Sequence, residues 1–543
     1  MQHTKSSSST EKIESFSRPS DRFLTRPLLA RALAALAAGL LASLLTVMLM
    51  GILRLTAGIP TPVELFGDHV LKLIPAAYFV GILVAFAPNS KTVPLGLALL
   101  GMIALGTLLG LLYSFIVRRI LPTKGYRPTR REWLTAAAMA IVMTLLAVLL
   151  FWVEIGQNFL GLPIGWAKLV TSLSLFADFS LYSLTLCLAY RSLLPKERVP
   201  GTPVAMQSRR QLLARAGVAT LSLGAVASTF GLVGGYLSRY ASYDGLSARP
   251  HNGVTPPITP NSEHYVVTQN PIDPTPDLNV WRLEVTGLVG SSGSYTYKEV
   301  QNLPSTSRAI TLECISNGPS GGLISTAIWQ GVPLRTLLER HGGAQPTAHY
   351  VAFTSVDGYV VSLPLDEVLA VDALLAWRMN GAELPLRHGF PLRVLVPGRY
   401  GEENPKWLTR VELTDHFVGG LYSDQGWYNG PLHTMSRIDR PRGHLPLGQS
   451  IEIGGIAFAG TRGISKVEVS VDGGNIWHVA TLEPPLSQDT WVLWSWLWTP
   501  SLPGKYTLVA RATDGTGAVQ TSHVQGTVPN GSTGYHMVAV EVG

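Results

Sequence analysis

Arg308-Ala-Ile-Thr-Leu-Glu-Cys314-Ile-Ser-Asn317 is the stretch around which the rest of the chain is organised. Half of its residues are apolar, and together with Thr311 they predict a strand that carries Cys314. Cys314 is one of only two cysteines in the 543-residue sequence, and the other, Cys187, lies inside an apolar run, so we expect no structural disulfide between them. No CxxC, CxxCH or HExxH pattern occurs, which argues against structural zinc, attached c-type haem and zincin chemistry. A lone cysteine on such a strand is most often a small buried apolar residue, so its role has to come from the surrounding sequence.

The composition indicates several domains, one of them in a membrane. The chain is too long for a single ordinary domain, and 46% of its residues are hydrophobic while only 14% are charged. The apolar excess lies mostly before residue 240. The formal net charge of +7 could suggest nucleic acid, but the basic residues cluster in short loops between apolar runs and do not show the repeated basic–aromatic interleaving of a nucleic-acid platform. This pattern is typical of membrane topology and argues against a nucleic-acid platform.

The N-terminal half is expected to form a membrane region at 28–239, behind a disordered, Ser-rich cytoplasmic tail at 1–27. Runs that are long and apolar enough to span a bilayer lie at 32–53, 93–117, 133–153, 169–190 and 216–238, with a shorter candidate at 73–87. The positive-inside rule places the N-terminal tail and the basic segments at 118–132 and 191–215 in the cytoplasm. Five crossings satisfy this rule if 73–87 is re-entrant or interfacial on the outer side. Six crossings with one violation of the rule are the alternative.

The last crossing would lead the C-terminal half out of the cytoplasm, giving a multi-pass cell-membrane protein with extracytoplasmic soluble domains. Ser208-Arg209-Arg210-Gln-Leu-Leu213, just before this crossing, resembles a twin-arginine export motif; an ordinary basic flank of a membrane helix is the alternative. Asp178 lies inside an apolar run and is expected to face the helix bundle. There, a helix–helix hydrogen bond is favoured over a proton or quinone role. The runs contain no histidine, so a bundle that holds b-type haem is not expected.

The C-terminal half is expected to contain a linker and two domains. Residues 240–262 are rich in Pro, Ser, Asn and Gly, which is typical of an extended tether. At 263–432, strand-like and helix-like segments interleave without a regular βαβ repeat, which predicts an α+β domain. At 433–543, short alternating segments and turn signals such as Asp472-Gly473-Gly474 predict an immunoglobulin-like β-sandwich of the seven-strand type. We expect a core or a domain interface, rather than a ligand cage, around Trp491, Trp494, Trp496 and Trp498.

An ordered series of motifs in this half carries a family resemblance. After Thr311-Leu-Glu-Cys314 the sequence continues with Ile324-Ser-Thr-Ala-Ile-Trp329-Gln-Gly331, Leu374-Leu-Ala-Trp-Arg-Met-Asn-Gly381, His388-Gly-Phe-Pro-Leu-Arg393 and Asn404-Pro-Lys406-Trp407. Each motif alone is weak, but their order and spacing together are specific. From Tyr265 to its C-terminus the chain resembles the sulfite oxidase superfamily of molybdopterin enzymes. The segment 433–543 is similar to the dimerisation domain of the same superfamily.

The resemblance implies a Mo-molybdopterin cofactor with Cys314 as the thiolate ligand to molybdenum. A soft thiolate suits a metal that is already held by the dithiolene sulfurs of the pterin. Arg393 lies on a predicted buried strand and needs an anion beside it, either the phosphate of the cofactor or a carboxylate such as Glu402 or Glu403. The resemblance assigns catalysis to Cys314, Trp427 and Tyr428, and cofactor binding to Tyr265, Gln269, Asn270, Cys314, Asn317, Thr354, Asp357, His388, Arg393, Asn404 and Lys406.

Two departures from the sulfite oxidase pattern weaken the case for sulfite as the substrate. Gln269 stands where sulfite oxidases carry an arginine that binds the anionic substrate, and Ser316-Asn-Gly-Pro-Ser-Gly321 stands where they carry basic residues. A neutral molecule such as a sulfoxide is therefore credible. The implied reaction is oxygen-atom transfer to or from a small substrate, either sulfite-like oxidation or sulfoxide-like reduction.

The implied partners follow from what the sequence lacks. It contains no haem or iron–sulfur motif, so electrons would be exchanged with a separate cytochrome or quinone-linked membrane protein. The dimerisation-type domain implies a possible homodimer. The rival reading is a non-catalytic, membrane-tethered binding protein with a β-rich ectodomain, in which the Cys314 motif series would be incidental. A transporter reading would rest on Asp178 alone.

Overall fold

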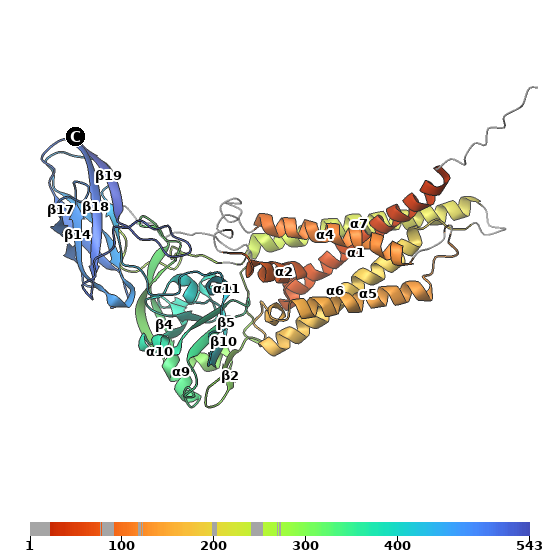
Figure 1. Ribbon diagram of the computed structural model, residues 1–543, viewed down its shortest axis with the longest axis horizontal. Helices are drawn as coiled ribbons and strands as arrows, with labels where there is room; N and C mark the ends of the chain where they lie inside the picture. Colours follow the sequence, from red (N-terminus) through yellow and green to blue (C-terminus); the bar gives the residue numbers. More distant parts are fainter. Residues whose placement is uncertain are drawn as a thin grey trace, which may run out of the picture. The chain divides into compact units, whose positions relative to one another are not determined.

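The computed structural model describes residues 22–75, 78, 92–117, 121, 123–197, 204–240, 253–268, 270 and 273–543. The chain falls into two compact units. The first comprises Met1–Met48, Gly101–Met143 and Ala177–Thr229, and the second comprises Leu49–Leu100, Thr144–Phe176 and Phe230–Gly543. Two connections between long helices therefore belong to the same unit as the soluble half (Figure 1).

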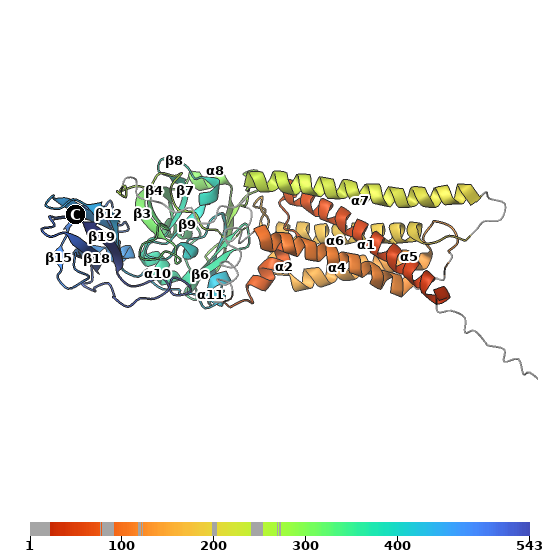
Figure 2. The same cartoon turned by 90° about the horizontal axis from the view of Figure 1, so that it is seen from above.

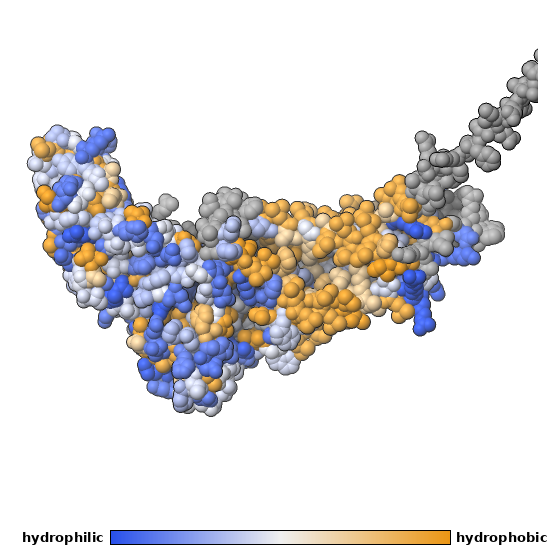
Figure 3. Space-filling model, in the orientation of Figure 1, coloured by the Kyte–Doolittle hydropathy of each residue, from blue (hydrophilic) through white to orange (hydrophobic). Residues whose placement is uncertain are grey.

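Long apolar helices make up the N-terminal half, namely α1 (Arg22–Ala57), α4 (Thr92–Val117), α5 (Arg130–Leu150), α6 (Ile164–Leu193) and α7 (Val204–Tyr240). Within the described residues, four helical segments are long and apolar enough to cross a membrane: Leu28–Ala57, Val93–Val117, Arg130–Leu150 and Ile164–Leu193. The remaining predicted crossing, 216–238, lies in α7, a continuous helix of 37 residues that also contains Arg209-Arg210 (Figure 2). Exposed leucines of α4 and α5 give this half an apolar outer surface (Figure 3).

Small residues bring the helices of the first unit close together. A methyl group added at Gly106 of α4 would lie 2.2 Å from the Ser43 hydroxyl of α1, and one added at Gly110 would lie 2.3 Å from the Ala35 carbonyl oxygen. Such close backbone approach is typical of helix packing in membranes. Asp178 of α6 is 2% exposed, so it faces the bundle as expected. Its Oδ1 atom makes no hydrogen bond to any described residue, so the expected helix–helix hydrogen bond is not seen for this oxygen.

A short helix and a short turn lie in the connections that belong to the second unit. Helix α2 (Pro62–Leu71) starts with a capping box, in which Thr61 caps the helix and the Glu64 side chain bonds back to the Thr61 amide. Glu64 also forms an ion pair with Arg54 of α1, at 3.1 Å. The one-turn helix η1 (Glu154–Gly156) follows α5. The predicted re-entrant segment 73–87 lies, apart from residues 73–75 and 78, outside the described residues.

The domain after residue 263 combines two sheets with short helices, in keeping with the α+β expectation. One sheet has the strand order β2-β1-β10-β5-β6, with β1 (Leu283–Gly287) parallel to β10 (Leu408–Thr414). The other has the order β3-β4-β7-β8, and β9 pairs with β7. The remaining strands are β2 (Gly293–Tyr295), β3 (Thr306–Glu313), β4 (Ile324–Pro333), β5 (Tyr350–Ser355), β6 (Val360–Pro364), β7 (Leu374–Met379), β8 (Ala382–Glu383) and β9 (Arg393–Leu395). The helices are α8 (Tyr297–Gln301), α9 (Leu334–Arg340), α10 (Leu365–Ala370), η2 (Leu386–His388), η3 (Gly401–Glu403) and α11 (Leu421–Asp424).

The C-terminal domain consists of two sheets packed face to face. Their strand orders are β11-β13-β17-β16 and β12-β19-β18-β14-β15. The strands are β11 (Met435–Arg440), β12 (Gly443–Leu445), β13 (Ile451–Phe458), β14 (Ile464–Ser470), β15 (His478–Val479), β16 (Thr481–Leu482), β17 (Val492–Trp498), β18 (Gly504–Asp514) and β19 (His536–Val542). Trp494 and Trp498 are buried with residues of both sheets in one hydrophobic core. Trp491 packs in a second cluster with Ile315 of the preceding domain, so the predicted core and interface roles are both confirmed for these three tryptophans.

Candidate functional site

Strand β3 delivers Cys314 to the centre of the candidate site. The strand pairs with β4 along its whole length, from Thr306 opposite Gly331 to Glu313 opposite Ile324. Cys314 follows directly, and its amide donates to the Leu323 carbonyl at 2.9 Å. Its side chain is buried, and burial, with a smaller effect of the Glu402 carboxyl, raises the pKa of the thiol to about 12. A thiolate here therefore requires a cation in contact with the sulfur.

Two neighbours narrow the space around Cys314. Tyr265 is 7% exposed and lies in the same buried cluster as Cys314. Gly401 passes so close that a methyl group added to it would lie 2.5 Å from the Tyr265 hydroxyl and 3.7 Å from the Cys314 Cα atom. A glycine is needed at this position because any larger residue would push against the tyrosine. The arrangement places the Tyr265 hydroxyl next to the segment that holds the thiol.

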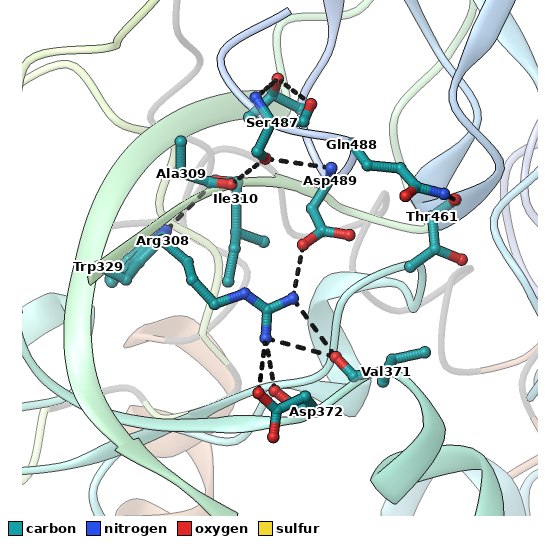
Figure 4. Close-up of polar contacts among 11 residues, drawn as sticks. Arg308, Ala309, Ile310, Trp329, Val371, Asp372, Thr461, Ser487, Gln488 and Asp489 are labelled. Carbon is teal, nitrogen blue, oxygen red and sulfur yellow. Dashed lines mark hydrogen bonds and ion pairs between the residues drawn. The ribbon is translucent and has the colours of Figure 1, made fainter. Parts of the chain in front are cut away.

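The C-terminal domain clamps β3 from its free edge (Figure 4). Arg308 donates to Asp489 Oδ2 at 2.6 Å, and the Thr311 amide donates to the Asp489 carbonyl at 2.9 Å. The Ser487 hydroxyl donates to the Ala309 carbonyl at 2.6 Å. The strand that carries the candidate metal ligand is therefore bonded along both edges, by β4 on one side and by the second domain on the other.

Asn317 organises the loop after Cys314. Its amide nitrogen donates to Glu313 Oε1 at 2.9 Å, and its amide oxygen accepts from the Leu323 amide at 3.0 Å. The Ser532 hydroxyl of the C-terminal domain donates to the Asn317 carbonyl at 2.5 Å. Both polar groups of the Asn317 side chain are thus engaged within the loop, and its cofactor-binding role stays a prediction.

Arg393 is a buried cation whose partners are backbone carbonyls. It is 5% exposed, and its two terminal nitrogens donate to the His388 carbonyl at 3.0 Å and the Asn404 carbonyl at 3.2 Å. Its Nε atom has no hydrogen-bond partner among the described residues. Glu403, one of the two carboxylates expected beside it, pairs instead with Arg399, at 3.3 Å. Burial lowers the pKa of Arg393 to about 10, so the site calls for an anion that the described protein residues do not supply.

Two buried histidines lie beside this cation. The His388 Nε2 atom lies 3.1 Å from the Asn261 carbonyl oxygen. Burial and the nearby Arg393 lower the pKa of His388 to about 3, so its ring is neutral and donates to that carbonyl. The ring of His264 lies 5.1 Å from that of His388, and its Nε2 atom has no hydrogen-bond partner among the described residues. The sequence reasoning missed His264; its position directly before Tyr265 was the available signal.

Asn270 and Asp357 form a second polar group of the site. The Asn270 side chain donates to Asp357 Oδ2 at 2.5 Å, which joins two segments that are far apart in the sequence. Burial raises the pKa of the Asp357 carboxyl, and the charge of Lys406 opposes this rise. Gln269, which was expected beside them, lies outside the described residues. Thr354 stands near the end of β5, three residues before Asp357.

Lys406 and Asn404 occupy the segment between η3 and β10. Lys406 donates to the Val267 carbonyl at 3.2 Å, and it is followed by Trp407 in a left-handed conformation with φ of 54°. Such backbone strain in a bulky residue is concentrated at functional sites. The Asn404 amide oxygen accepts from the Val396 amide at 2.7 Å, so this side chain holds the backbone of the loop.

Trp427 and Tyr428 lie at a small cavity with acidic and aromatic walls. The cavity has a volume of about 30 Å³, and its lining includes Tyr359, Glu402, Glu403, Tyr422, Trp427 and Tyr428. The rings of Trp427 and Tyr422 are 4.4 Å apart, and the Tyr428 hydroxyl donates to the Pro431 carbonyl at 2.9 Å. Burial raises the pKa of Glu402 well above its usual range and that of Glu403 to about 8. The sequence reasoning had considered these two acids only as partners of Arg393.

No group of three or more His, Cys, Asp or Glu side chains in the described part of the chain is arranged to hold a metal ion. Cys314 would therefore be a single protein ligand to a metal that is held mainly by other atoms. The unpartnered Nε–H of Arg393 is a donor for an anionic group. His264 is neutral and its Nδ1–H donates to the Tyr265 carbonyl at 3.2 Å, so its unpartnered Nε2 atom is an acceptor. Together with the buried Cys314 thiol, this set fits a pterin with a phosphate and a thiolate-bound metal.

Comparison with known proteins agrees with this geometry. Residues 270–422 match the family described as "Oxidoreductase molybdopterin binding domain", and residues 436–542 match the "Mo-co oxidoreductase dimerisation domain". Sulfite oxidase of Gallus gallus is 30% identical over 337 residues, which cover 51% of this chain and 72% of the relative. The chain belongs to the sulfite oxidase family. The cofactor of the family is Mo-molybdopterin, and this sulfite oxidase family member is accordingly a molybdopterin-binding oxidoreductase.

Other relatives are matched over a smaller share of their length. Mitochondrial sulfite oxidase of Homo sapiens is 32% identical over 309 residues, covering 47% of this chain and 56% of the relative. "Inducible nitrate reductase [NADH] 1" of Glycine max is 30% identical over 311 residues, which cover 45% of this chain and 34% of the relative. The chain thus spans about a third to just over half of these two relatives. The solved structure of the sulfane dehydrogenase SoxCD from Paracoccus pantotrophus aligns over 50% of this chain and 76% of its own, with a TM-score of 0.45 and 24% identity.

Proposed function

We propose that this chain is a membrane-anchored, extracytoplasmic oxidoreductase that transfers an oxygen atom to or from a small, neutral substrate. The observation that carries the proposal is that the buried Cys314 thiol and the buried Arg393 guanidinium both lie near the Tyr265 side chain, while Arg393 has no carboxylate partner among the described residues. A thiol and a cation that both need a compensating partner are accounted for by one metal-bearing, phosphate-bearing group.

The residues of the site have three proposed roles: to bind the metal, to bind the other parts of the cofactor, and to hold the pocket in shape. When bound, the molybdenum cofactor supplies two-electron oxygen-atom transfer. Cys314 would hold the metal, while Arg393 and Lys406 would bind anionic oxygens, as a fork and as a point charge respectively. His388 is kept neutral by burial and its N–H donates to the Asn261 carbonyl, so its Nδ1 atom would accept a hydrogen bond without adding charge. Asn270 and Asp357 would orient the pocket by joining its two sides.

The acidic cavity favours a neutral substrate over an anion. Glu402 and Glu403 line it, and Glu313 lies directly before Cys314. Burial raises the pKa of Glu313 to about 7, so this carboxyl is partly ionised at neutral pH and would repel an anion bound nearby. Sulfite and nitrate, for which the relatives are named, are anions. A sulfoxide-like oxygen donor, or its reduced form as an oxygen acceptor, avoids this repulsion.

Two contacts agree with the proposed order of crossings after residue 118, and they hold for five and for six crossings alike. The two basic segments are linked by a β-bridge between Thr123 and Lys196, as expected if both lie on the cytoplasmic side. On the other side, the amide of Asn158, between α5 and α6, donates to the Val356 carbonyl of the molybdopterin-binding domain at 3.0 Å. The proposed division is therefore a tail at 1–27, a membrane region at 28–239, a linker at 240–262, a catalytic domain at 263–432 and a sandwich domain at 433–543.

The proposed partners follow from the family and from the topology. The match to the dimerisation domain supports a homodimer. Electrons would pass to or from a cytochrome or a quinone-linked membrane protein, since these 543 residues themselves carry no haem or iron–sulfur motif.

The experiment is a substrate comparison on the purified full chain in detergent. With a reduced viologen dye as electron donor, a sulfoxide should be turned over. With an oxidised dye as acceptor, sulfite should give at least about tenfold lower kcat/KM than an uncharged sulfide, which corresponds to about 1.4 kcal/mol of discrimination. Preferred turnover of sulfite or nitrate would refute the neutral-substrate proposal. A folded chain that turns over none of these and contains no pterin would favour the non-catalytic binding protein.

A further inference from the structure

The connection between α5 and α6 contacts the loops that form the cofactor pocket. We propose that residues 154–161, here called the strap, position the molybdopterin pocket, with Gln157 and Asn158 as its positioning residues. The membrane region is then a working part of the site as well as an anchor. The identity of the group that binds in the pocket rests on the function proposed above. The mechanical coupling between the strap and the loops does not depend on that function.

Backbone hydrogen bonds fasten the strap to both sides of the pocket. The Asn158 amide donates to the Val356 carbonyl at 3.0 Å, directly before Asp357. The Phe159 carbonyl accepts from the Thr275 amide at 3.1 Å, and the Leu160 carbonyl accepts from the Asp277 amide at 2.9 Å. Asp357 and the segment that follows Asn270 are thus tied to one short piece of chain. These are the two sides that the Asn270–Asp357 hydrogen bond joins.

The strap is itself rigid. The Asn158 side chain accepts from the Leu160 amide at 3.0 Å and donates to the Ala57 carbonyl at the end of α1 at 3.0 Å. Gly161 has a φ of +87°, and a methyl group added there would lie 2.6 Å from Trp281 Cδ1. Trp281 is completely buried in the core of the molybdopterin-binding domain. The strap therefore lies against that core, at a position where only glycine combines this backbone angle with this close contact.

Gln157 connects the strap to helix α2 and to the turn that carries Asp357. It is 4% exposed, and its Nε2 atom donates to Asp68 Oδ2 of α2 at 2.9 Å. A methyl group added at Gly358 would lie 2.6 Å from Gln157 Cγ, so the glutamine packs directly on the residue after Asp357. A shift of Gln157 must move this turn and, with it, the Asp357 carboxylate that Asn270 holds.

The test exchanges donor and acceptor between Gln157 and Asp68. Gln157→Glu removes the donor and sets two buried carboxyl groups against each other. Burial already raises the pKa of Asp68 to about 7, and a second carboxyl beside it raises this pKa further. The variants are therefore compared at about pH 9, where the two carboxyl groups lose the proton that they share at lower pH and the strap should separate from α2. The double variant Asp68→Asn with Gln157→Glu restores one donor and one acceptor in the same place. Gln345→Glu is the matched control, because the Gln345 side chain also donates a single hydrogen bond, to the Val289 carbonyl at 2.9 Å.

Two readouts are measured on the full chain in detergent. The first is the rate of pterin release, and the second is amide hydrogen exchange of residues 273–277 and 355–359 in cofactor-free protein. Gln157→Glu should speed both by about tenfold, the size expected for one buried hydrogen bond, and the double variant should return both towards wild type. The control should leave both unchanged.

Unchanged exchange in Gln157→Glu, or failure of the double variant to restore it, would overturn the strap proposal. If Gln157→Glu does not fold, exchange in the double variant and in Gln157→Met replaces it: wild-type exchange in the former with faster exchange in the latter supports the strap, and any other pattern refutes it. If wild-type protein contains no pterin, the proposed function fails, while the exchange data still decide whether the strap orders these loops.

Discussion

Replacement of Arg393 by methionine should weaken pterin binding strongly while it changes the stability of the pterin-free chain only slightly. Arg393 is buried, has no carboxylate partner among the described residues and keeps an unpartnered Nε atom. If it serves a phosphate-bearing cofactor, the pterin-free chain carries the cost of an uncompensated charge, and only the loaded chain benefits from it. Methionine has a similar length and no charge, so the variant removes the charge with little change in packing.

The magnitudes follow from the contacts of Arg393. An uncompensated buried charge costs about 3–5 kcal/mol, and its removal relieves that cost. The His388 and Asn404 carbonyls each lose a donor, which costs about 1–3 kcal/mol apiece. These contributions nearly cancel, so the free energy of unfolding of the pterin-free chain should change by less than about 2 kcal/mol. The loaded chain loses in addition a charged hydrogen bond of about 1.5–3 kcal/mol, so pterin affinity should fall about 10- to 150-fold.

The assay compares urea unfolding of the pterin-free chain with the rate of pterin release from the loaded chain. Arg410→Met is the matched control, because Arg410 pairs with Glu284 at 2.7 Å on a partly exposed face of the same domain. The control should lose at most about 1 kcal/mol of stability and no pterin affinity. If Arg393→Met destabilises the pterin-free chain strongly and keeps its pterin, Arg393 is a structural residue and the assignment is wrong.

Two further predictions concern the pH dependence of stability and the contacts of β3 with Ser487 and Asp489 of the C-terminal domain, here called the clamp. The folded pKa of His388 is about 3 and its unfolded value about 6.5, so between these values the unfolded chain binds more protons and stability falls as pH falls. His388→Gln keeps a donor for the Asn261 carbonyl but cannot be protonated, so urea unfolding of the pterin-free chain should show a shallower loss below about pH 6.5. Arg308→Met leaves Asp489, which is 13% exposed, without its ion-pair partner. It should cost about 1.5–3 kcal/mol of stability and speed pterin release, because β3 carries Cys314.

Each of these predictions has its own control and its own contrary result. For the clamp, Asp372→Asn should cost less than about 0.5 kcal/mol, because Asp372 is 48% exposed and lies 3.7 Å from Arg308; asparagine also tolerates the left-handed conformation found there. If Arg308→Met and Asp372→Asn lost equal amounts of unfolding free energy, the ion pair of Arg308 with Asp489 would make no specific contribution to stability. For His388, the contrary result is a variant whose free energy of unfolding falls with decreasing pH as steeply as that of wild type. Groups other than His388 would then take up the protons on unfolding.

Local patterns in the sequence predicted the elements of the site well. Strand β3, which ends one residue before Cys314, was recognised from its residue types and its motif. Helix α7 begins earlier than the apolar run at 216–238, because the arginines and glutamines before that run are good helix formers that hydropathy does not count.

Long-range pairing was not accessible from the sequence. The ion pair of Glu403 with Arg399 replaced the expected pairing with Arg393, because two arginines stood within reach of the same acid and only the packed fold decides between them. Contacts of the strap with residues more than 100 positions away, such as that of Asn158 with Val356, leave no periodic signal. The acidic lining formed by Glu402 was missed for the same reason.

The central claim is that Cys314 holds the molybdenum of a pterin cofactor, and metal analysis of purified chain tests it most directly. Molybdenum and pterin are measured in wild type and in Cys314→Ser, both produced in a host that makes the cofactor. Wild type should contain near-stoichiometric molybdenum and pterin. The variant should show an altered Mo(V) electron paramagnetic resonance signal, because an oxygen donor replaces sulfur. A folded wild-type chain without molybdenum, or a variant with an unchanged signal, would contradict it.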